Sequence, residues 1–510
     1  MEKVEANEDL INFESKVEVP NKRIALWKVF LICFAVSFLF LMVCSANSFL
    51  YAFNDNQDTN WYITMGNGML AGKVPYKDLF EQKGPIVYYV FSIICSFGNP
   101  YINVFILEVI CVSLFLFFSY KIMIKFTSQF RSIIGIVILC LIYTTSSFFV
   151  VGGGAVEEFC APIFAWFLLV FFEYIFDKKD ISFKRAFIIG ILLAILFLTK
   201  FTLVIMPAII LLIWFIVKLR QRDVKRTFLS VLFMLISFIS IFLLSLIYYF
   251  IKGAISDLFK VYFYDNLFLY KTDLNITYNL NLIFVECFVG IAFVIFGFVI
   301  YIYKYNRKAI NFAILVLSYF IILLFSGNFS YYFQPLLVFS SVGVAYLIEY
   351  ISKIKFNFIF RKLSLILTIV ICFALCFPFG NVTNELTWQK DDYIHFQIAE
   401  DIADYGIENP SLFCYKMWDY GFYNVTGIIP SEKYFANNLF DEDNFPEMYT
   451  AFYEAIEQKR NDFVLVRVEN YEEDKEFLDQ FYQIYKEYSY RYYKDTSNSY
   501  NFTVYLMIPI

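Results

Sequence analysis

The feature that most constrains this chain is a series of apolar runs, each close to 20 residues long. A helix of about 20 apolar residues crosses the roughly 30 Å hydrocarbon core of a bilayer. Of the 510 residues, 60% are hydrophobic, whereas soluble domains average about 45–50%. We therefore predict a polytopic α-helical membrane protein with about eleven transmembrane helices. The candidate spans are 24–45, 101–120, 132–151, 159–176, 186–199, 201–217, 227–251, 280–303, 309–326, 335–352 and 363–379.

One long apolar run, residues 186–217, carries Lys200 near its middle and has basic residues on both flanks. Lys and Arg concentrate in the cytoplasmic loops of membrane proteins. Two basic flanks on one side of the membrane predict a hairpin of two short helices. A single tilted helix is the alternative, and it would reverse the orientation of every later span.

The basic clusters also predict the orientation of the chain. If the tail 1–23 is cytoplasmic, every strong basic cluster falls on the cytoplasmic side, as the positive-inside rule requires. The opposite side then receives the loop 46–85, the short loop 152–158 and the C-terminal part of the chain. We expect a multi-pass plasma-membrane protein whose membrane domain covers residues 24–380.

The C-terminal region 381–510 differs in charge from the rest of the chain. It holds 24 acidic and 10 basic residues, a net charge of −14, whereas the whole chain carries −5. This change predicts a separate extracytoplasmic domain. Strand patterns and helical patterns alternate in it, and no glycine-rich phosphate loop follows a strand, so we predict a small α/β domain without a nucleotide site. The strand patterns are 411–417, 462–469 and 501–508, and the helical patterns are 391–405, 446–460 and 472–486.

The loop 46–85 contains an unusual number of charged residues between two membrane segments: Asp55, Asp58, Asp78, Glu81 and Lys83. Its residues 59–71 predict a short helix lying on the membrane surface, with its apolar side chains against lipid. The run after Pro85 ends near Phe97 and is too short to span the membrane, which predicts a re-entrant or interfacial segment.

A second acidic site follows three consecutive glycines, in the stretch from Gly152 to Glu158. Two adjacent carboxylates, Glu157 and Glu158, are costly next to lipid, so they should face a wet cavity or a partner. Simple solvation at the membrane surface is the alternative.

Two acidic sites on one face of a membrane suit the transfer of a sugar from a lipid phosphate. The acceptor needs a carboxylate that takes up its proton, and the departing phosphate needs a cation. Lys83 and Lys200 are both expected near the outer surface. Lys83 is the better candidate because it shares a loop with the carboxylates, whereas Lys200 can simply extend to the interface.

Three short segments of this loop resemble the first outer loop of the GT-C membrane glycosyltransferases. They are Asp58-Thr-Asn-Trp-Tyr62, Gly72-Lys-Val-Pro-Tyr76-Lys-Asp78 and Lys83-Gly-Pro85. The most similar branch is the family 39-like one of protein O-mannosyltransferases and aminoarabinose lipid A transferases. The Glu157-Glu158 pair and the Ser330-Tyr-Tyr-Phe-Gln-Pro335 stretch resemble two further elements of the family. The chain departs from the family pattern at Thr59, where a Glu is usual, and at Tyr331, where a His is common.

The resemblance implies roles for particular residues. Asp58 would be the catalytic base, with Asp55 as the alternative, and Lys83 would contact the lipid phosphate. Glu157 or Glu158 would support the acceptor or a divalent cation. A divalent cation at Glu157 or Glu158 is an open alternative. A metal site with several histidines is excluded, because His395 is the single histidine. No other cofactor is implied. The remaining candidates for substrate binding are Tyr76, Asp78, Glu81, Lys200, Tyr331 and Tyr332.

The predicted function is inverting hexosyl transfer from a polyprenyl-phosphate-linked sugar to an envelope glycan, lipid or protein; no nucleic acid is expected. A transporter or flippase for a lipid-linked sugar is one alternative. It predicts charged residues within the membrane, and Glu108, Glu173 and Glu286 fall in or at the ends of spans. A non-catalytic envelope assembly protein is the other alternative, and it would function without the Asp58 carboxylate.

Overall fold

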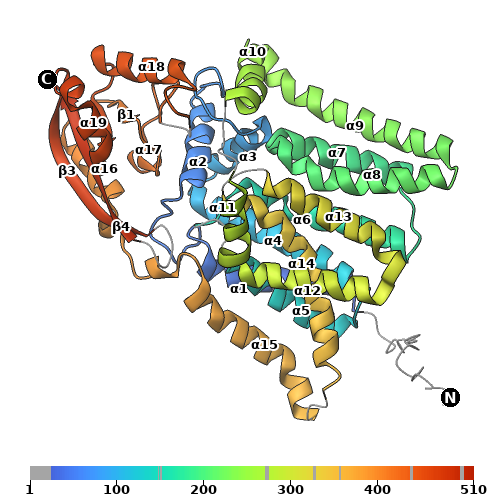
Figure 1. The fold of residues 1–510 in the computed structure, drawn as a ribbon. Coiled ribbons are helices and arrows are strands. Elements are labelled where there is room, and N and C mark those ends of the chain that lie inside the picture. Colours follow the sequence, from blue (N-terminus) through green and yellow to red (C-terminus); the bar gives the residue numbers. More distant parts are fainter. Residues whose placement is uncertain are drawn as a thin grey trace, which may run out of the picture.

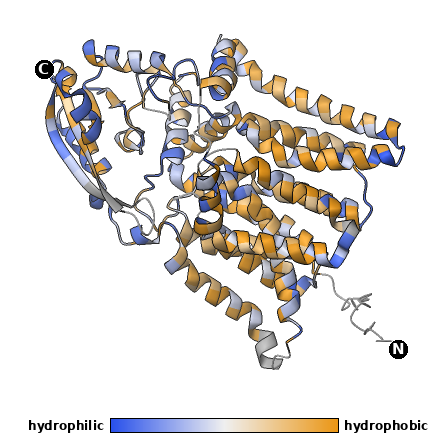
Figure 2. Ribbon diagram, in the orientation of Figure 1, coloured by the Kyte–Doolittle hydropathy of each residue, from blue (hydrophilic) through white to orange (hydrophobic). Residues whose placement is uncertain are grey.

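A computed structural model describes residues 24–146, 149, 152–269, 275–325, 329–354, 358–436, 440–493 and 499–510. A body of roughly aligned helices forms most of the molecule, and a smaller domain with a sheet covers one end of it (Figure 1). By length and composition, seven helices in the described part of the chain can cross a membrane, and several shorter apolar helices accompany them. The helical body is hydrophobic along its length, whereas the sheet domain is largely hydrophilic (Figure 2).

The predicted polytopic fold is confirmed, since a helix overlaps each of the eleven predicted spans. The span predicted at 132–151 already ends at Thr144, and part of the remainder lies outside the described residues. The helices are α1 (Leu26–Cys44), α4 (Pro100–Met123), α5 (Gln129–Thr144), α6 (Val156–Phe176), α7 (Phe183–Thr199), α8 (Ile205–Arg220), α9 (Val224–Ile251), α12 (Phe288–Tyr305), α13 (Ile310–Leu324), α14 (Leu337–Ile351) and α15 (Phe358–Phe379).

The long apolar run around Lys200 is a hairpin, as predicted, and the single tilted helix is wrong. The α-helix α7 ends at Thr199, and the short 3-10 helix η2 (Phe201–Val204) leads into α8. Arg185 at the start of α7 donates to Glu173 at 2.8 Å. Lys218 near the end of α8 donates to Asp180 at 2.8 Å. The start of α7 and the end of α8 therefore both lie at the α6–α7 connection, while the turn at Lys200 lies at the opposite end of the two helices.

Ion pairs gather the basic loops at one end of the helical body. Lys125 after α4 pairs with Asp177 after α6 at 2.9 Å, and Arg131 of α5 pairs with Glu349 of α14 at 2.7 Å. We call this the basic end. The sheet domain lies at the other end (Figure 1). The grouping of loops is thus the predicted one, and the assignment of the basic end to the cytoplasm stays a prediction.

Two short helices follow α1 at the end that the sheet domain covers: α2 (Gln57–Leu70) and α3 (Pro85–Cys95). The side chain of Asn56 accepts a hydrogen bond from the Thr59 amide and caps α2, which satisfies one of the free amides at a helix start. Trp61, Tyr62 and Met65 are buried. The prediction that this helix exposes its apolar side chains to lipid is therefore wrong, because α3 on one side and the C-terminal domain on the other enclose it (Figure 1).

Irregular helices make up the connection between α9 and α12, at the same end. The span predicted at 280–303 is consequently divided, and its continuous part begins only at Phe288. The short segments of this connection and of the later loops are α10 (Ile255–Leu258), η3 (Phe259–Leu269), α11 (Ile276–Asn281), η4 (Leu282–Glu286), η5 (Asn306–Ala309) and η6 (Ser330–Leu336).

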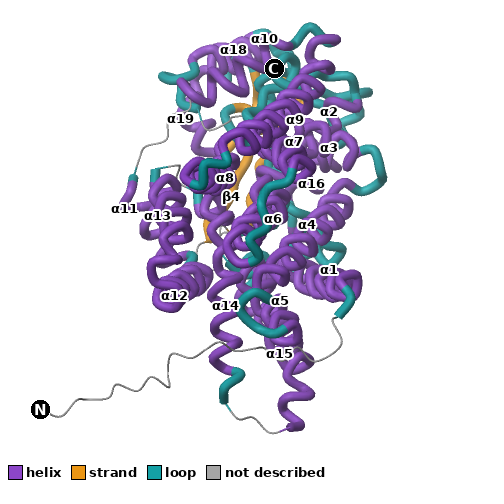
Figure 3. The backbone as a smooth tube through the Cα atoms, turned by 90° about the vertical axis from the view of Figure 1, so that its right-hand side faces the viewer, coloured by secondary structure: helices purple, strands orange, loops and turns teal. Residues whose placement is uncertain are grey.

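The C-terminal domain is the predicted α/β unit, built on a four-stranded mixed sheet in the order β1-β2-β4-β3. Strands β1 and β2 are parallel, and the other neighbours are antiparallel. Seen from the basic end, the sheet lies behind the helical body (Figure 3). The elements are η7 (Thr383–Glu385), η8 (Lys390–Asp392), α16 (Ile394–Asp404), β1 (Leu412–Tyr415), α17 (Phe422–Thr426), α18 (Pro446–Glu457), β2 (Phe463–Arg467), α19 (Val468–Leu478), β3 (Tyr482–Tyr493) and β4 (Ser499–Pro509).

The helix predicted at 472–486 is wrong in its second half. Helix α19 ends at Leu478, and the strand β3 begins at Tyr482. The segment 482–493 is rich in tyrosine, which favours strands, and it pairs antiparallel with β4 from end to end apart from one bulge. Pairing with a distant strand outweighs the local helical pattern.

Candidate active site

A glycine brings the loop before α3 into contact with the α7–α8 hairpin. The Gly84 amide donates to the Thr199 carbonyl at 2.9 Å. A Cβ atom at Gly84 would lie 2.0 Å from the Leu198 carbonyl oxygen, so only glycine permits this approach. The contact places Lys83, just before Gly84, close to Lys200, just after Thr199. The Lys-Gly-Pro element therefore has a structural reason in this chain.

The three glycines 152–154 hold the second acidic site against the first outer loop. All three have positive φ angles, which glycine adopts without strain. The Thr59 hydroxyl donates to the Gly153 carbonyl at 2.7 Å, and Asn47 and Asn54 both donate to the Gly152 carbonyl at 3.2 Å. These bonds bring the start of α6, with its two glutamates, next to the start of α2, with Asp58.

Lys200 is the centre of the resulting group of side chains. Its Nζ atom donates to Glu157 Oε1 at 2.7 Å, and the Glu157 side chain is 1% exposed. The same Nζ atom lies 3.4 Å from the ring centre of Tyr332 and 5.8 Å from that of Tyr331. Asp58 and Lys83 both lie within electrostatic range of Lys200. We call Asp58, Lys83, Glu157 and Lys200 the acid–lysine cluster.

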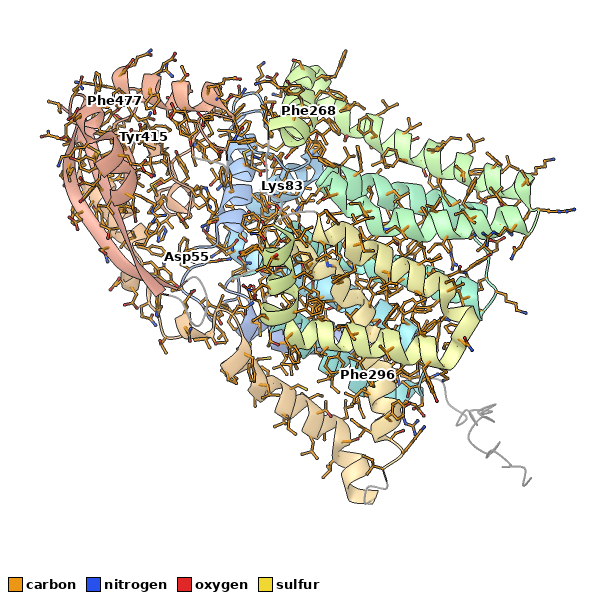
Figure 4. The ribbon with its side chains drawn as sticks, viewed as in Figure 1. Asp55, Lys83, Phe268, Phe296, Tyr415 and Phe477 are labelled. Atoms are coloured by element: carbon orange, nitrogen blue, oxygen red, sulfur yellow. The ribbon has the colours of Figure 1, made fainter. Side chains whose placement is uncertain are left out.

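Lys83 enters the cluster from the loop, and it lies between α2 and the helical body (Figure 4). Its Nζ atom is 5.7 Å from the ring centre of Tyr62 and 3.7 Å from Glu81 Oε1. Burial favours the neutral amine, but Tyr62, Asp58 and Glu81 outweigh it and raise the pKa of Lys83 well above its usual value. Lys83 is therefore a permanent cation in a largely enclosed place.

Several buried polar atoms of this region have no hydrogen-bond partner among the described residues. They include Asp58 Oδ2, Glu157 Oε2 and the Tyr62 hydroxyl. A buried polar atom without a partner typically costs about 1–3 kcal/mol. Their concentration around two lysines indicates a place where a polar ligand completes the bonding.

The two candidate bases, Asp55 and Asp58, lie in different surroundings. Asp58 shares its surroundings with Lys83, Lys200 and the tyrosine pair. Asp55 instead lies at the edge next to the C-terminal domain (Figure 4), where it acts electrostatically on Glu385. Burial and the Asp55 charge raise the pKa of Glu385 well above its usual value. Of the two, Asp58 is the one that the fold brings to the lysines.

Three further predicted residues hold the loop in shape. The Tyr76 hydroxyl donates to the Lys83 carbonyl at 2.7 Å, and an Asp78 oxygen accepts from the Val74 amide at 2.8 Å. Glu81 accepts from the Lys83 amide at 2.9 Å and from the Tyr88 hydroxyl. Tyr76 is fully buried, and its hydroxyl holds the backbone of Lys83; a substrate contact by Tyr76 stays a prediction.

The two adjacent glutamates do not form a shared metal site. Glu157 pairs with Lys200, whereas Glu158 accepts from the Gly154 amide at 2.8 Å and lies next to Glu108. In the described parts of the chain, no group of three His, Cys, Asp or Glu side chains suits a metal ion. The ligand set does not fit a cation bound jointly by Glu157 and Glu158.

One buried carboxylate, with Lys260, Lys433 and Glu447 as its charged neighbours, has no counterpart in the sequence prediction. Asp265, within η3, is fully buried, and neither of its carboxylate oxygens has a hydrogen-bond partner among the described residues. The next residue, Asn266, donates to the Gln82 carbonyl at 2.9 Å. Burial, opposed by Lys260, raises the pKa of Asp265 to about 6. Its only signal in the sequence is an acid within a stretch rich in aromatic and aliphatic residues.

The helices that overlap the eleven predicted spans, the two short helices α2 and α3 and the C-terminal sheet domain together form a polytopic membrane fold. The fold is the one found in ArnT from Cupriavidus metallidurans. The crystal structure of ArnT in the apo state superposes with a TM-score of 0.62 at 12% identity, covering 94% of this chain and 97% of that one. ArnT bound to undecaprenyl phosphate superposes with a TM-score of 0.60 at 12% identity, covering 94% and 98%.

Comparisons by sequence give no further information. No family model matches the chain, and no curated protein matches it. The predicted resemblance to GT-C membrane glycosyltransferases is thus confirmed as a likeness of fold, over 94% of the chain.

Proposed function

We propose that this protein transfers a hexose from a polyprenyl-phosphate carrier to an acceptor of the cell envelope, on the outer face of the membrane. The observation that carries the proposal is a buried Asp58 oxygen that has no hydrogen-bond partner among the described residues and lies within electrostatic range of Lys83 and Lys200. The ArnT-like fold supports it, because ArnT has been solved with undecaprenyl phosphate bound. A base and two cations are the groups that such a transfer requires.

The two lysines suit a lipid phosphate. Opposite charges attract more strongly in a partly buried site than in water, and both lysine side chains are less than one-fifth exposed. Glu157 accepts one hydrogen bond from Lys200 and so directs its Nζ atom. The Tyr331 and Tyr332 rings next to Lys200 offer apolar faces on which a sugar can stack.

The proposed reaction is a single displacement. Asp58 accepts the proton of an acceptor hydroxyl or amine, and the freed lone pair attacks the anomeric carbon of the donor. The bond from that carbon to the phosphate oxygen breaks, and its electron pair stays on the phosphate. Lys83 and Lys200 stabilise the negative charge that develops there. Attack from the side opposite to the phosphate inverts the anomeric configuration.

Two of the three carboxylates that favoured a transporter, Glu108 and Glu173, have partners at the end of a neighbouring helix or beyond it. Glu108 accepts from the Ser45 hydroxyl at 2.7 Å and from the Asn47 amide at 3.3 Å. Glu173 accepts from Arg185 at the basic end. These positions do not describe an ion path through the middle of the membrane, and we therefore favour the transferase.

The test is a transfer assay with the full chain in proteoliposomes. A radiolabelled polyprenyl-phosphate hexose is supplied together with an envelope fraction as the acceptor. We expect Asp58→Asn to lower transfer by at least about 10²-fold, the usual contribution of a general base. Asp55→Asn is the matched variant, and it should retain transfer.

Each outcome of this assay has a meaning. Transfer by the wild type that Asp58→Asn abolishes and Asp55→Asn retains supports the proposal. The opposite pattern would move the base to Asp55. Equal transfer by all three proteins, or passage of the lipid across the bilayer without consumption of the donor, would overturn the transferase in favour of an assembly protein or a flippase.

A further inference from the structure

A cleft of about 420 Å³ lies between α2 and the C-terminal domain. Its walls come from the last two turns of α2 and from the segment 423–430, which contains the end of α17. This volume falls in the range of about 300–1,000 Å³ that is usual for small-molecule sites. Helix α2 lies between the sheet domain and the helical body (Figure 1), so the cleft lies on the C-terminal domain side of that helix.

The cleft is lined without any charged side chain. Its polar side chains are those of Thr64, Asn67, Asn424 and Tyr423, of which the Tyr423 hydroxyl donates to the Phe435 carbonyl. Its apolar walls include Leu70 and Ile428. Neutral amides and hydroxyls recognise neutral hydroxyl-bearing ligands, whereas a phosphate or carboxylate would need lysine or arginine. The lining therefore selects against the lipid phosphate that the acid–lysine cluster suits.

One of the amides is available for a ligand. The Asn67 side chain is half-buried, and it makes no hydrogen bond within the described parts of the chain. It can donate two hydrogen bonds and accept two.

The polar groups of Thr64 and Asn424 are held in place by the protein. The Thr64 hydroxyl donates to Asp419 Oδ2 at 2.7 Å and lies 3.2 Å from Asn424 Oδ1. Asn424 Nδ2 donates to the backbone and side-chain oxygens of Asn60, both at 3.0 Å. Since Thr64 has a single hydroxyl hydrogen and Asp419 is nearer, the Asn424 oxygen keeps capacity to accept from a ligand. This network joins the cleft to the buried centre of the domain.

The cleft is distinct from the acid–lysine cluster. Asn67 follows Asp58 by nine residues, which corresponds to about 14 Å along an α-helix and to the opposite face of it. One sugar unit cannot contact both positions. A chain of sugars that continues around α2 can present one unit to Asp58 and another to the cleft.

We propose that the cleft binds a neutral sugar unit of a carbohydrate acceptor, at a distance from the unit that receives the hexose. The inference rests on the proposed function and makes the acceptor a glycan rather than a bare lipid or a peptide. In this proposal the C-terminal domain binds the acceptor chain through Asn424, and α2 binds it through Asn67.

The experiment measures binding and transfer separately, with the full chain in detergent micelles. Binding is read on a printed array of neutral hexose and N-acetylhexosamine oligosaccharides and of their uronic-acid and phosphate-bearing counterparts. The variants are Asn67→Ala, which removes the free amide, and Ala71→Trp, which fills the cleft from an exposed position. Asn444→Ala, before α18, is the matched control. Consumption of the lipid-linked donor is measured in parallel.

We expect the wild type to bind neutral oligosaccharides, and Asn67→Ala to bind them at least about tenfold more weakly, as the loss of a ligand hydrogen bond predicts. Ala71→Trp should abolish binding, and Asn444→Ala should not change it. Absence of neutral glycan binding by the wild type, a preference for anionic glycans, or unchanged binding by both variants would overturn the inference. If donor consumption still depends on Asp58 in that case, the proposed function stands and only the glycan site fails.

Discussion

The two ends of the helical body use charge in different ways. At the basic end, lysines and arginines close ion pairs with neighbouring acids, as Lys125 does with Asp177 and Arg131 with Glu349. At the other end, Lys83 and Lys200 share a small region with Asp58 and Glu157, and each of these two acids keeps a buried oxygen without a hydrogen-bond partner among the described residues.

This difference separates charges that hold loops together from charges that await a ligand. The pairs at the basic end satisfy one another and are partly exposed, where an ion pair contributes about 0–1 kcal/mol. The acid–lysine cluster is enclosed and incompletely bonded, so its free energy falls when a suitable anion and a hydroxyl enter.

The largest effect is expected from removing a lysine of the cluster. Lys83→Met keeps the length of the side chain and removes its charge. If Lys83 stabilises the departing phosphate, transfer should fall by about 10²–10³-fold, the typical loss for one group that stabilises developing charge. The measurement is the initial rate of transfer at saturating donor. Lys83→Arg should recover part of the rate, whereas a rate equal to that of the wild type in Lys83→Met would contradict the role.

A smaller effect is expected from Glu157→Gln, which keeps the shape of the side chain and removes its charge. The bond from Lys200 then loses its ionic character, and a charge-assisted bond is worth about 1.5–3 kcal/mol. We expect transfer to fall by about tenfold or more. Glu158→Gln is the comparison, because Glu158 faces Gly154 and not Lys200. An equal loss in both variants would show that the site depends on fold integrity rather than on the Lys200 contact.

The raised pKa of Asp265 predicts that the stability of the folded protein depends on pH. The Asp265 pKa is raised to about 6 by burial, above the value of about 3.9 in an unfolded chain. The folded protein therefore binds this proton more tightly, and the stabilising contribution present below about pH 4 is lost as the pH rises through about 6.

The measurement is the Tm in detergent between about pH 4 and about pH 7. Asp265→Asn, which mimics the protonated form, should raise the Tm at neutral pH. At acidic pH the Tm values of the variant and the wild type should converge. A Tm difference that does not change with pH would contradict the assignment.

The smallest effect on catalysis is expected at the basic end. Lys218, whose side chain is buried, pairs with Asp180 and Asp223 at 2.8 and 2.5 Å. Lys218→Met should lower the Tm, because it leaves two acids without their cation. The rate per folded molecule should stay within about twofold of the wild type, because the pair lies at the opposite end of the helical body from the cluster. A loss of transfer comparable to that of Lys83→Met would remove the contrast between the two ends.

Much of the membrane fold follows from hydropathy alone, because each apolar run must be long enough to cross the bilayer and each break must carry polar residues. The hairpin at Lys200 is an example, where one charged residue in an apolar run and two basic flanks predict the turn. The outer loop and the Gly152–Glu158 stretch can be predicted for a similar reason, since their acidic residues stand out between apolar segments.

The remaining features depend on contacts between distant segments. Trp61 and Tyr62 have the composition of a membrane-surface helix, but contacts with other segments bury them. Trp61 packs against Phe435 of the C-terminal domain, and Tyr62 packs against Phe91 of α3. The strand β3 likewise requires β4. The pairing of Glu157 with Lys200, the separate partners of Glu158 and the burial of Asp265 cannot be deduced from spacing along one chain.

The contact of Gly84 with the end of α7 affects which substitutions the protein can tolerate over evolution. Two backbone segments, and not side-chain packing, set the separation between Lys83 and Lys200. The aromatic residues around them can therefore change, while the separation of the two cations stays constant. Gly84 itself has no such freedom, because any larger residue would push the loop away from the hairpin and separate the two cations.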